Sequence, residues 1–274
     1  MLKKLGLSRS GYHNWINRKV SSQEIRRREV KNKIKEIWNY SKQIYGAPNI
    51  AHDLWKQGFN TSIRTVSKYM KQLGIKACWV KKFRAPKIKP FNENLHNVLE
   101  QQFNPVRPDA VWCTDITYIW TGTGFVYLSS IMDLFSRKII AWKLSNTMEE
   151  KFVIETIELA KKRRRITQPL IIHSDRGSHY IAGEYKKACR KMTLSYSKKH
   201  YPWDNACIES FHSVIKREWL YRFSIKDLEH CQSLVFEYIE SFYNLRRNHS
   251  HCGYISPIEF ENIYWAKQCK KIAV

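Results

Sequence analysis

Residues 169–183 read PLIIHSDRGSHYIAG, a stretch in which an apolar run gives way to an aspartate and a glycine. The run Leu170-Ile171-Ile172 has the composition of a short buried strand, and Asp175 follows it within three residues. An aspartate close to a glycine is most often a turn former. A strand end is also a rigid support, so Asp175 has a second interpretation as a residue held in place for chemistry.

Strand and helix patterns alternate on both sides of this stretch. Segments rich in β-branched and aromatic residues predict three neighbouring antiparallel strands, at 110–120, 125–135 and 137–145. Two further short strands are predicted at 169–175 and 193–197. Apolar residues at helical spacing predict helices over 148–164, 180–192, 205–221 and 228–243. This order predicts an α/β fold with a mixed five-stranded sheet flanked by helices, and not a doubly wound parallel sheet.

The N-terminal part of the chain has no strand pattern. Residues 1–21 are interpreted as a short leader, and residues 22–76 as an all-α, helix-turn-helix-like DNA-binding domain of three helices. An ordinary three-helix packing unit fits the same pattern about as well. The third helix, expected to begin at an N-cap on Asn60 or Thr61, keeps Arg64 and Lys68 on its polar side, where they suit DNA phosphates.

Charge and composition narrow the class of partner. The chain of 274 residues carries 48 Lys and Arg against 24 Asp and Glu, a net charge of +24. This excess attracts polyanions, most commonly nucleic acid, although an anionic membrane surface or the ribosome would fit the charge equally well. Residues 77–108 are basic and contain several prolines, which indicates a linker, with a short helix expected over 95–102.

Other sequence signals indicate a reduced, cytoplasmic protein. No apolar run is long enough to span a bilayer, and the N-terminus lacks an apolar signal core. The seven cysteines are scattered and form no Cys-x-x-Cys pair, so neither a disulfide scaffold nor a zinc site is expected.

Three acids lie at positions suited to holding a metal. Asp115 is in the middle of the first predicted strand, Asp175 is just past the fourth, and Glu209 is in the first turns of the helix over 205–221. Adjacent central strands would bring the two aspartates together, and the helix would present Glu209 to both. Clustered carboxylates repel one another unless cations neutralise them, and hard oxygen ligands suit Mg²⁺ or Mn²⁺. Two such ions would clamp the oxygens of a phosphodiester displacement.

Each acid also has a structural interpretation when it is taken alone. Asp115 could bond a neighbouring backbone group, Asp175 could form a turn, and Glu209 could be a surface residue near the positive end of its helix. Their joint occurrence in this order favours the metal site. Asp133 is a competing acid that we interpret as structural, because it ends a strand before a tight connection. Lys216 lies two helical turns after Glu209, on the same helix face.

Five blocks of the sequence resemble, in order, the signature blocks of the family-three transposases of bacterial insertion sequences, in particular the second-reading-frame product (OrfB). They are WCTDITYI, YLSSIMDLFSRKIIAWKL, IIHSDRGSHY, DNACIESFHSVIKRE and YNLRRNHSHCGYISPIEFE. LGLSRSGYHNW and the region of YGAPNI resemble the family's leader and helix-turn-helix, so the resemblance covers nearly the whole chain. The interval between Asp175 and Glu209 is slightly shorter than is usual in the family.

The resemblance implies a fold and a catalytic site. The fold is a ribonuclease-H-like core over residues 109–222, of the DDE transposase and retroviral integrase superfamily, with a C-terminal helical extension over 223–274. The site is a metal triad at Asp115, Asp175 and Glu209, with Mg²⁺ or Mn²⁺ as the cofactor and two ions expected. Lys216, Lys198, Lys199 and Arg176 are the expected phosphate contacts.

The resemblance also implies a function and partners. The chain would be a DNA transposase that hydrolyses a phosphodiester at the ends of an insertion sequence and then transfers the strand. Its implied partners are double-stranded DNA of the terminal repeats and target, further copies in a synaptic complex, and a first-frame protein fused to it by frameshifting, with no membrane partner. A bacterial, nucleoid-associated location follows. Two alternatives stay open, a catalytically decayed DNA-binding regulator and a ribonuclease-H-type nuclease.

Overall fold

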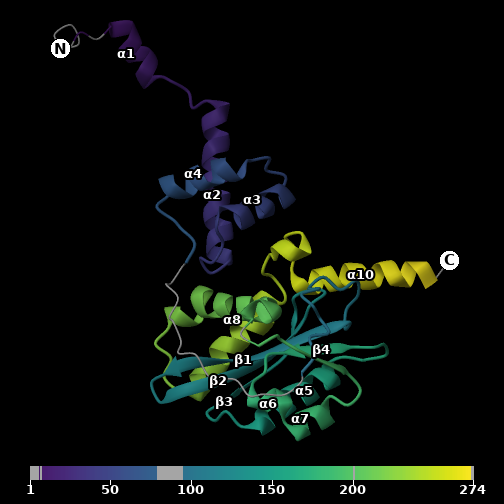
Figure 1. Cartoon of the computed structure of the whole chain (residues 1–274). Helices are drawn as coiled ribbons and strands as arrows, with labels where there is room; N and C mark the ends of the chain where they lie inside the picture. Colours follow the sequence, from purple (N-terminus) through teal and green to yellow (C-terminus); the bar gives the residue numbers. More distant parts are fainter. Residues whose placement is uncertain (1–5, 7, 79–94, 200, 273–274) are drawn as a thin grey trace. The chain divides into compact units, whose positions relative to one another are not determined.

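The computed structural model describes residues 6, 8–78, 95–199 and 201–272, and the chain divides into two compact units, Met1–Cys78 and Trp79–Val274 (Figure 1). The described part of the first unit is helical, whereas the second unit contains the sheet. Within these described ranges, no helix has both the length and the apolar character that crossing a membrane requires.

The described part of the first unit contains four helices: α1 (Arg9–Ile16), α2 (Ser22–Tyr40), α3 (Ala47–Lys56) and α4 (Ile63–Gln72). The last three are the helices predicted within 22–76, whereas α1 lies in the segment expected to be only a leader. Buried apolar residues from α2, α3 and α4 form the core of this unit: Val30, Ile34, Ile37, Ile50, Leu54, Val66 and Met70.

The N-cap of α4 differs from the expected one. Ser62 caps the helix, with its hydroxyl accepting the amide of Thr65 at 3.1 Å. The expected caps, Asn60 and Thr61, lie before it. The carbonyl of Thr61 accepts a hydrogen bond from the indole of Trp55, so this residue is used to connect α3 with the turn.

The second unit is built on the predicted mixed sheet of five strands. The strands are β1 (Val111–Thr121), β2 (Gly124–Asp133), β3 (Ile139–Ser145), β4 (Ile171–Ser174) and β5 (Thr193–Tyr196). Their spatial order is β3-β2-β1-β4-β5. The first three pair antiparallel, and β4 and β5 run parallel to β1. This is the strand arrangement of a ribonuclease-H-like fold, as expected.

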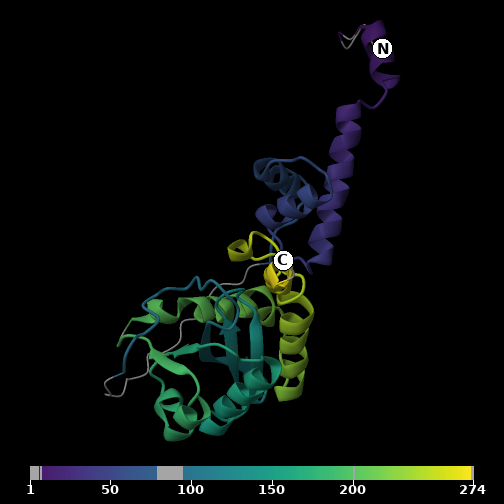
Figure 2. The ribbon, with the colours of Figure 1, turned by 90° about the vertical axis from the view of Figure 1, so that its right-hand side faces the viewer.

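Helices cover both faces of the sheet (Figure 1 and Figure 2). On one face, α5 (Glu150–Arg163) packs with α6 (Ser178–Ile181) and α7 (Gly183–Ala188) over an apolar core that includes Trp112, Phe152, Ile157, Ile172 and Tyr185. On the other face lies α8 (Ala206–Glu218). The chain continues through α9 (Leu228–Phe236) and a π-helical segment, Glu237–Tyr243, to α10 (Pro257–Ile272).

The predicted helix over 95–102 is wrong. The amides of Val98 and Leu99 donate to the hydroxyl of Ser195 on β5, at 2.9 and 3.0 Å. Glu100 and Gln101 then take positive φ angles of 44° and 60°, which a right-handed helix excludes. Tertiary contacts with β5 therefore replace the local helical preference.

Three other helix predictions needed revision. The predicted helix over 180–192 is broken into α6 and α7 at Ala182, whose backbone is extended with ψ of 151°. The predicted helix over 205–221 ends at Glu218 and is followed by a short 3₁₀ turn. The helix predicted over 228–243 was not the last one, because α10 follows it.

The short interval between Asp175 and Glu209 leaves β5 paired with β4, and the amide of Ser197 still donates to the carbonyl of Ser174 at 2.9 Å.

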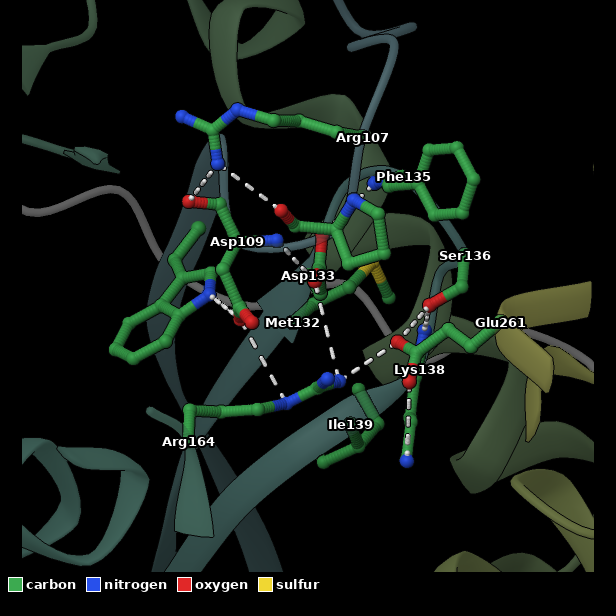
Figure 3. Close-up of polar contacts among 12 residues, drawn as sticks. Arg107, Asp109, Met132, Asp133, Phe135, Ser136, Lys138, Ile139, Arg164 and Glu261 are labelled. Atoms are coloured by element: carbon green, nitrogen blue, oxygen red, sulfur yellow. Dashed lines mark hydrogen bonds and ion pairs between the residues drawn. The ribbon is translucent and has the colours of Figure 1, made fainter. Parts of the chain in front are cut away.

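Asp133 has the structural role that its position predicted (Figure 3). It is fully buried, and its carboxylate accepts the amides of Asp109 and Phe135 at 2.8 and 2.9 Å. Burial raises the pKa of this carboxyl to about 7. The guanidinium of Arg164 lies 3.9 Å from Asp133 and 2.6 Å from the carboxylate of Glu261 on α10. This network anchors α10 to the end of β2.

Candidate active site

Asp115 lies in a part of β1 that does not pair with the neighbouring strand β4. β4 ends at Ser174, so it pairs with β1 only through Val111, Trp112 and Cys113. Cys113 is opposite His173, and continuing this parallel register by two residues brings Asp115 level with Asp175. Asp115 on β1 and Asp175, directly after the adjacent strand β4, therefore lie at the same level of the sheet, as expected from the sequence.

The helix α8 crosses β1 and presents a polar face to it. Glu209, His212 and Lys216 follow one another at spacings of three and four residues, so they share this face. His212 Nδ1 lies 3.3 Å from Asp115 Oδ2, and Lys216 Nζ donates to Thr117 Oγ1 at 2.7 Å. These contacts advance along β1 and α8 in the same direction, so Glu209 lies towards Asp175.

The amide side chain of Asn205 fixes the start of α8. Its Nδ2 donates to the carbonyl of Thr114 at 3.2 Å, directly before Asp115 in β1. The neighbouring Asp204 accepts the backbone amide of Lys198 at 2.7 Å and the side-chain amide of Gln101 at 2.9 Å. The sequence WDN before the helix therefore sets the position of Glu209 relative to both aspartates.

The electrostatics of Asp175 indicate that the three acids are close together. Burial, and after it the charges of Asp115 and Glu209, raise the pKa of Asp175 to about 7. The hydrogen bond from the amide of Gly177 acts in the opposite sense. Asp175 is nevertheless open to solvent as a residue, and Glu209 is exposed. A carboxyl that many atoms surround but water still reaches is typical of a concave site.

The carboxylates do not form a preassembled metal cage. Among the described residues, no three His, Cys, Asp or Glu side chains converge closely enough to hold a metal ion. The donors are nevertheless the hard oxygens that Mg²⁺ and Mn²⁺ prefer, and their mutual repulsion is what a divalent cation would relieve. The chemistry of the donor set therefore fits such ions.

The contact between Gly177 and the carboxylate of Asp175 explains why a glycine follows the strand. Its amide donates to Asp175 Oδ1 at 2.9 Å, and a Cβ at this position would lie 3.0 Å from the same oxygen. A side chain at 177 would therefore push the carboxylate out of place.

We expect Gly177→Ala to lower DNA cleavage while leaving the fold intact, because only the Asp175 carboxylate has to move. Gly183→Ala is the matched control, since a Cβ on Gly183 would meet nothing within 4 Å. The measurement is the rate of metal-dependent DNA nicking beside a thermal melt. Equal rates for the two variants would show that the placement of Asp175 tolerates the methyl group.

Sequence analysis missed two residues beside Asp115. His212 Nε2 lies 2.6 Å from the hydroxyl of Ser130, which is the cross-strand partner of Asp115 in β2. His212 thus bridges Ser130 and Asp115. The spacing of His212 between Glu209 and Lys216 was visible in the sequence, whereas the role of Ser130 depends on the register between β1 and β2.

The structure places the predicted phosphate contacts in different surroundings. Lys216 is partly buried, and its Nζ lies 4.6 Å from the centre of the Tyr118 ring. Burial lowers its pKa to about 8, against the opposing effect of Asp115. Lys198 and Lys199 are exposed just after β5. The guanidinium of Arg176 donates to the carbonyls of Ser197 and Leu95, at 2.7 and 3.0 Å, and so serves as a brace inside the fold.

The predicted contacts of the first unit lie together on α4. Arg64 and Lys68 are exposed and one turn apart. With Lys71 they line a hollow of about 510 Å³.

Comparisons with known proteins agree with these observations. Residues 105–202 and 190–257 match two models of an integrase core domain, and residues 24–83 match an HTH-like domain. Transposase InsF for insertion sequence IS3A of Escherichia coli (strain K12) is 34% identical over 270 residues, covering 96% of this chain and 93% of the relative. The transposase for insertion sequence element IS904 of Lactococcus lactis subsp. lactis (strain IL1403) is 34% identical over 249 residues, covering 90% and 98%.

Solved structures of a retroviral intasome and of an integrase catalytic core are similar at lower identity. A simian T-cell lymphotropic virus intasome in complex with a PP2A regulatory subunit gives a TM-score of 0.49 at 12% identity, covering 83% of this chain and 74% of that one. The catalytic core domain of BIV integrase gives a TM-score of 0.43 at 19% identity, covering 60% and 99%.

Proposed function

This chain belongs to the family-three (IS3) transposases of bacterial insertion sequences, and on that premise we propose that Asp115, Asp175 and Glu209 are its catalytic carboxylates. The protein is a DNA transposase, an enzyme that transfers polynucleotide strands. We propose that it hydrolyses a phosphodiester at each end of its own insertion sequence. The freed 3′-hydroxyl is then directed at another phosphodiester.

The observation that carries this proposal is that three acids from three elements lie near one end of the sheet, where the charges of two of them act on the third. Asp115 comes from β1, Asp175 from the end of β4 and Glu209 from the first turn of α8. The charges of Asp115 and Glu209 both act on Asp175. Acids placed in this way on rigid elements repel one another. The arrangement is therefore favourable only when a cation is bound among them.

Two Mg²⁺ or Mn²⁺ ions are the proposed cofactor. When bound, such ions supply an activated water or hydroxyl and neutralise charge on the reacting phosphate. Asp115, within β1, and Asp175, directly after β4, would hold them, and Glu209 would complete the site and orient the nucleophile. Lys216, which is mostly protonated at neutral pH with a pKa of about 8, would offer a cation to the phosphate.

We propose that residues 22–76 bind DNA through Arg64 and Lys68, and that Lys198 and Lys199 contact phosphates next to the core, residues 109–222. We also propose that the chain acts in a synaptic complex of several copies. A frameshift fusion to a first-frame protein would then supply further DNA recognition.

The test is strand cleavage of a labelled duplex that carries one end of the element, with Mg²⁺, with Mn²⁺ and with a chelator. We expect nicking at the element end that depends on metal. Binding without cutting by the fused protein would identify a decayed regulator. Degradation of RNA–DNA hybrids with no action on duplex ends would identify a ribonuclease-H-type nuclease.

His212 is expected to position Asp115. Replacing a residue that orients a metal ligand typically costs about 10- to 100-fold in metal affinity or activity, and we expect a loss of this size for His212→Ala. His212→Asn keeps a donor near the place of Nδ1 and should recover part of the activity. Ser130→Ala removes only the outer contact and should cost less. The measurement is the cleavage rate as a function of Mg²⁺ concentration, and identical metal dependence in all four proteins would contradict this role.

A further inference from the structure

A basic groove lies at one end of the sheet, opposite the end near which Asp115, Asp175 and Glu209 lie. It consists of two hollows that share Thr167 and Gln168 in their walls. The larger, of about 770 Å³, lies between the C-terminal ends of α5 and α7, and the smaller, of about 250 Å³, lies beside α10. Gln168 precedes β4, whereas Asp175 follows it. Seven residues of extended chain put on the order of 20 Å between the groove and the acids.

Unpaired cations line this groove. The larger hollow is lined by Arg190 and Lys191 and the smaller one by Arg165, and all three are exposed. Within the described part of the chain, none of these three side chains makes an ion pair or a hydrogen bond. The only carboxylate lining the larger hollow, among the residues described, is Glu158, and it pairs with Lys161 at 2.7 Å.

Helix dipoles account for only part of this charge. The C-terminus of a helix carries about half a negative charge, which basic residues of its last turn offset. The last turns of α5 and α7 already contain such residues: Lys161, Lys162, Arg163, Lys186 and Lys187. Arg190 and Lys191 lie beyond the end of α7, and they extend the positive charge across a hollow that faces α5. Gathering like charges around one hollow is unfavourable unless an anion lies between them.

The anchoring of α10 adds an aromatic residue to the groove. Glu261 holds α10 to Arg164 at 2.6 Å, and it also accepts from the hydroxyl of Ser136 at 2.7 Å (Figure 3). One helical turn later, Trp265 lines the smaller hollow beside Arg165 and is 48% exposed. The smaller hollow therefore has a cation and an exposed aromatic ring in its lining.

We propose that the basic groove binds the phosphate backbone of a second DNA duplex segment, one that is held away from the acids while another segment is cut. The proposal rests on the transposase function, because moving an element requires the enzyme to hold two duplex segments at once. A polyanion with several phosphates would suit cations that line two adjoining hollows.

The test compares two double variants of equal charge change. Arg165→Glu with Arg190→Glu alters the groove, and Lys162→Glu with Lys267→Glu alters exposed cations of α5 and α10 that line neither hollow. The first assay is binding of a short duplex of unrelated sequence, without metal, by the full chain carrying Glu209→Gln. We expect the groove variant to bind about tenfold more weakly, with a salt slope shallower by about 1.8, the value for two lost phosphate contacts. We expect the control pair to bind like the parent.

The second assay separates this proposal from the function on which it rests. In the otherwise wild-type chain, the groove variant should still cut a short element-end duplex but join it poorly to a target plasmid. Unchanged binding, or an equal loss in the control pair, would overturn the groove proposal. If neither the wild-type chain nor its fusion to the first-frame protein cuts the duplex, the proposed function fails, and the metal-free binding assay still decides whether the groove holds DNA.

Discussion

Glu209→Gln is expected to abolish DNA cleavage while DNA binding and stability stay at wild-type values. Glutamine keeps the size and shape of the side chain but loses the charge needed to hold a cation. If several kcal/mol of transition-state stabilisation depend on this carboxylate, the rate falls on the order of a thousandfold. Glu209 is exposed on the first turn of α8, so the substitution should leave folding unaffected.

Glu229→Gln is the matched control for this change. Glu229 is also exposed, and it also lies in the first turn of a helix, α9. It should therefore experience the same local effect of losing a charge near a helix N-terminus. Both proteins are assayed for nicking and for binding of the element-end duplex. A Glu209→Gln protein that cuts like wild type would exclude the proposed triad, and one that loses binding as well would point to a structural role.

Glu261→Ala is expected to produce the largest loss of stability. The carboxylate of Glu261 is almost fully buried and accepts from Arg164 at 2.6 Å, from Ser136 at 2.7 Å and from Lys138 at 3.2 Å. Its removal leaves Arg164 with more distant acids, Asp109 at 3.6 Å and Asp133 at 3.9 Å. Breaking a buried pair in this way costs about 3–5 kcal/mol.

Urea unfolding followed by tryptophan fluorescence measures this loss. For a unit of this size, each kcal/mol lowers the melting temperature by about 2–4 °C, so a drop of about 10 °C is expected. Glu259→Ala, an exposed acid on the same helix, should cost less than about 1 kcal/mol. Replacing Arg164 and Glu261 together with methionine should recover much of the stability, because no uncompensated charge then remains buried. Equal losses for Glu259→Ala and Glu261→Ala would refute a special role for the network.

The strands, and the helix that carries Glu209, were predictable because their signals are local. The composition of 110–120 predicted β1 to within one residue at each end, and the spacing along α8 predicted its inward face. The segment 95–102 was not predictable, because the hydroxyl of Ser195, far away in sequence, takes its amides. The contact between Ser130 and His212 was also out of reach, since it depends on the register of β1 and β2.

The early end of β4 leaves part of β1 without a neighbouring strand, and such an edge is a template for the pairing of foreign strands and for aggregation. Here α8 covers that edge. The side chain of Asn205 donates a hydrogen bond to the carbonyl of Thr114, and Lys216 donates one to the side chain of Thr117. The helix α8, which presents Glu209, therefore also shields the unpaired part of β1 from other strands. Under the proposed function, the covering of this edge and the placement of a catalytic carboxylate depend on the same helix, so a change that displaces α8 would disturb both.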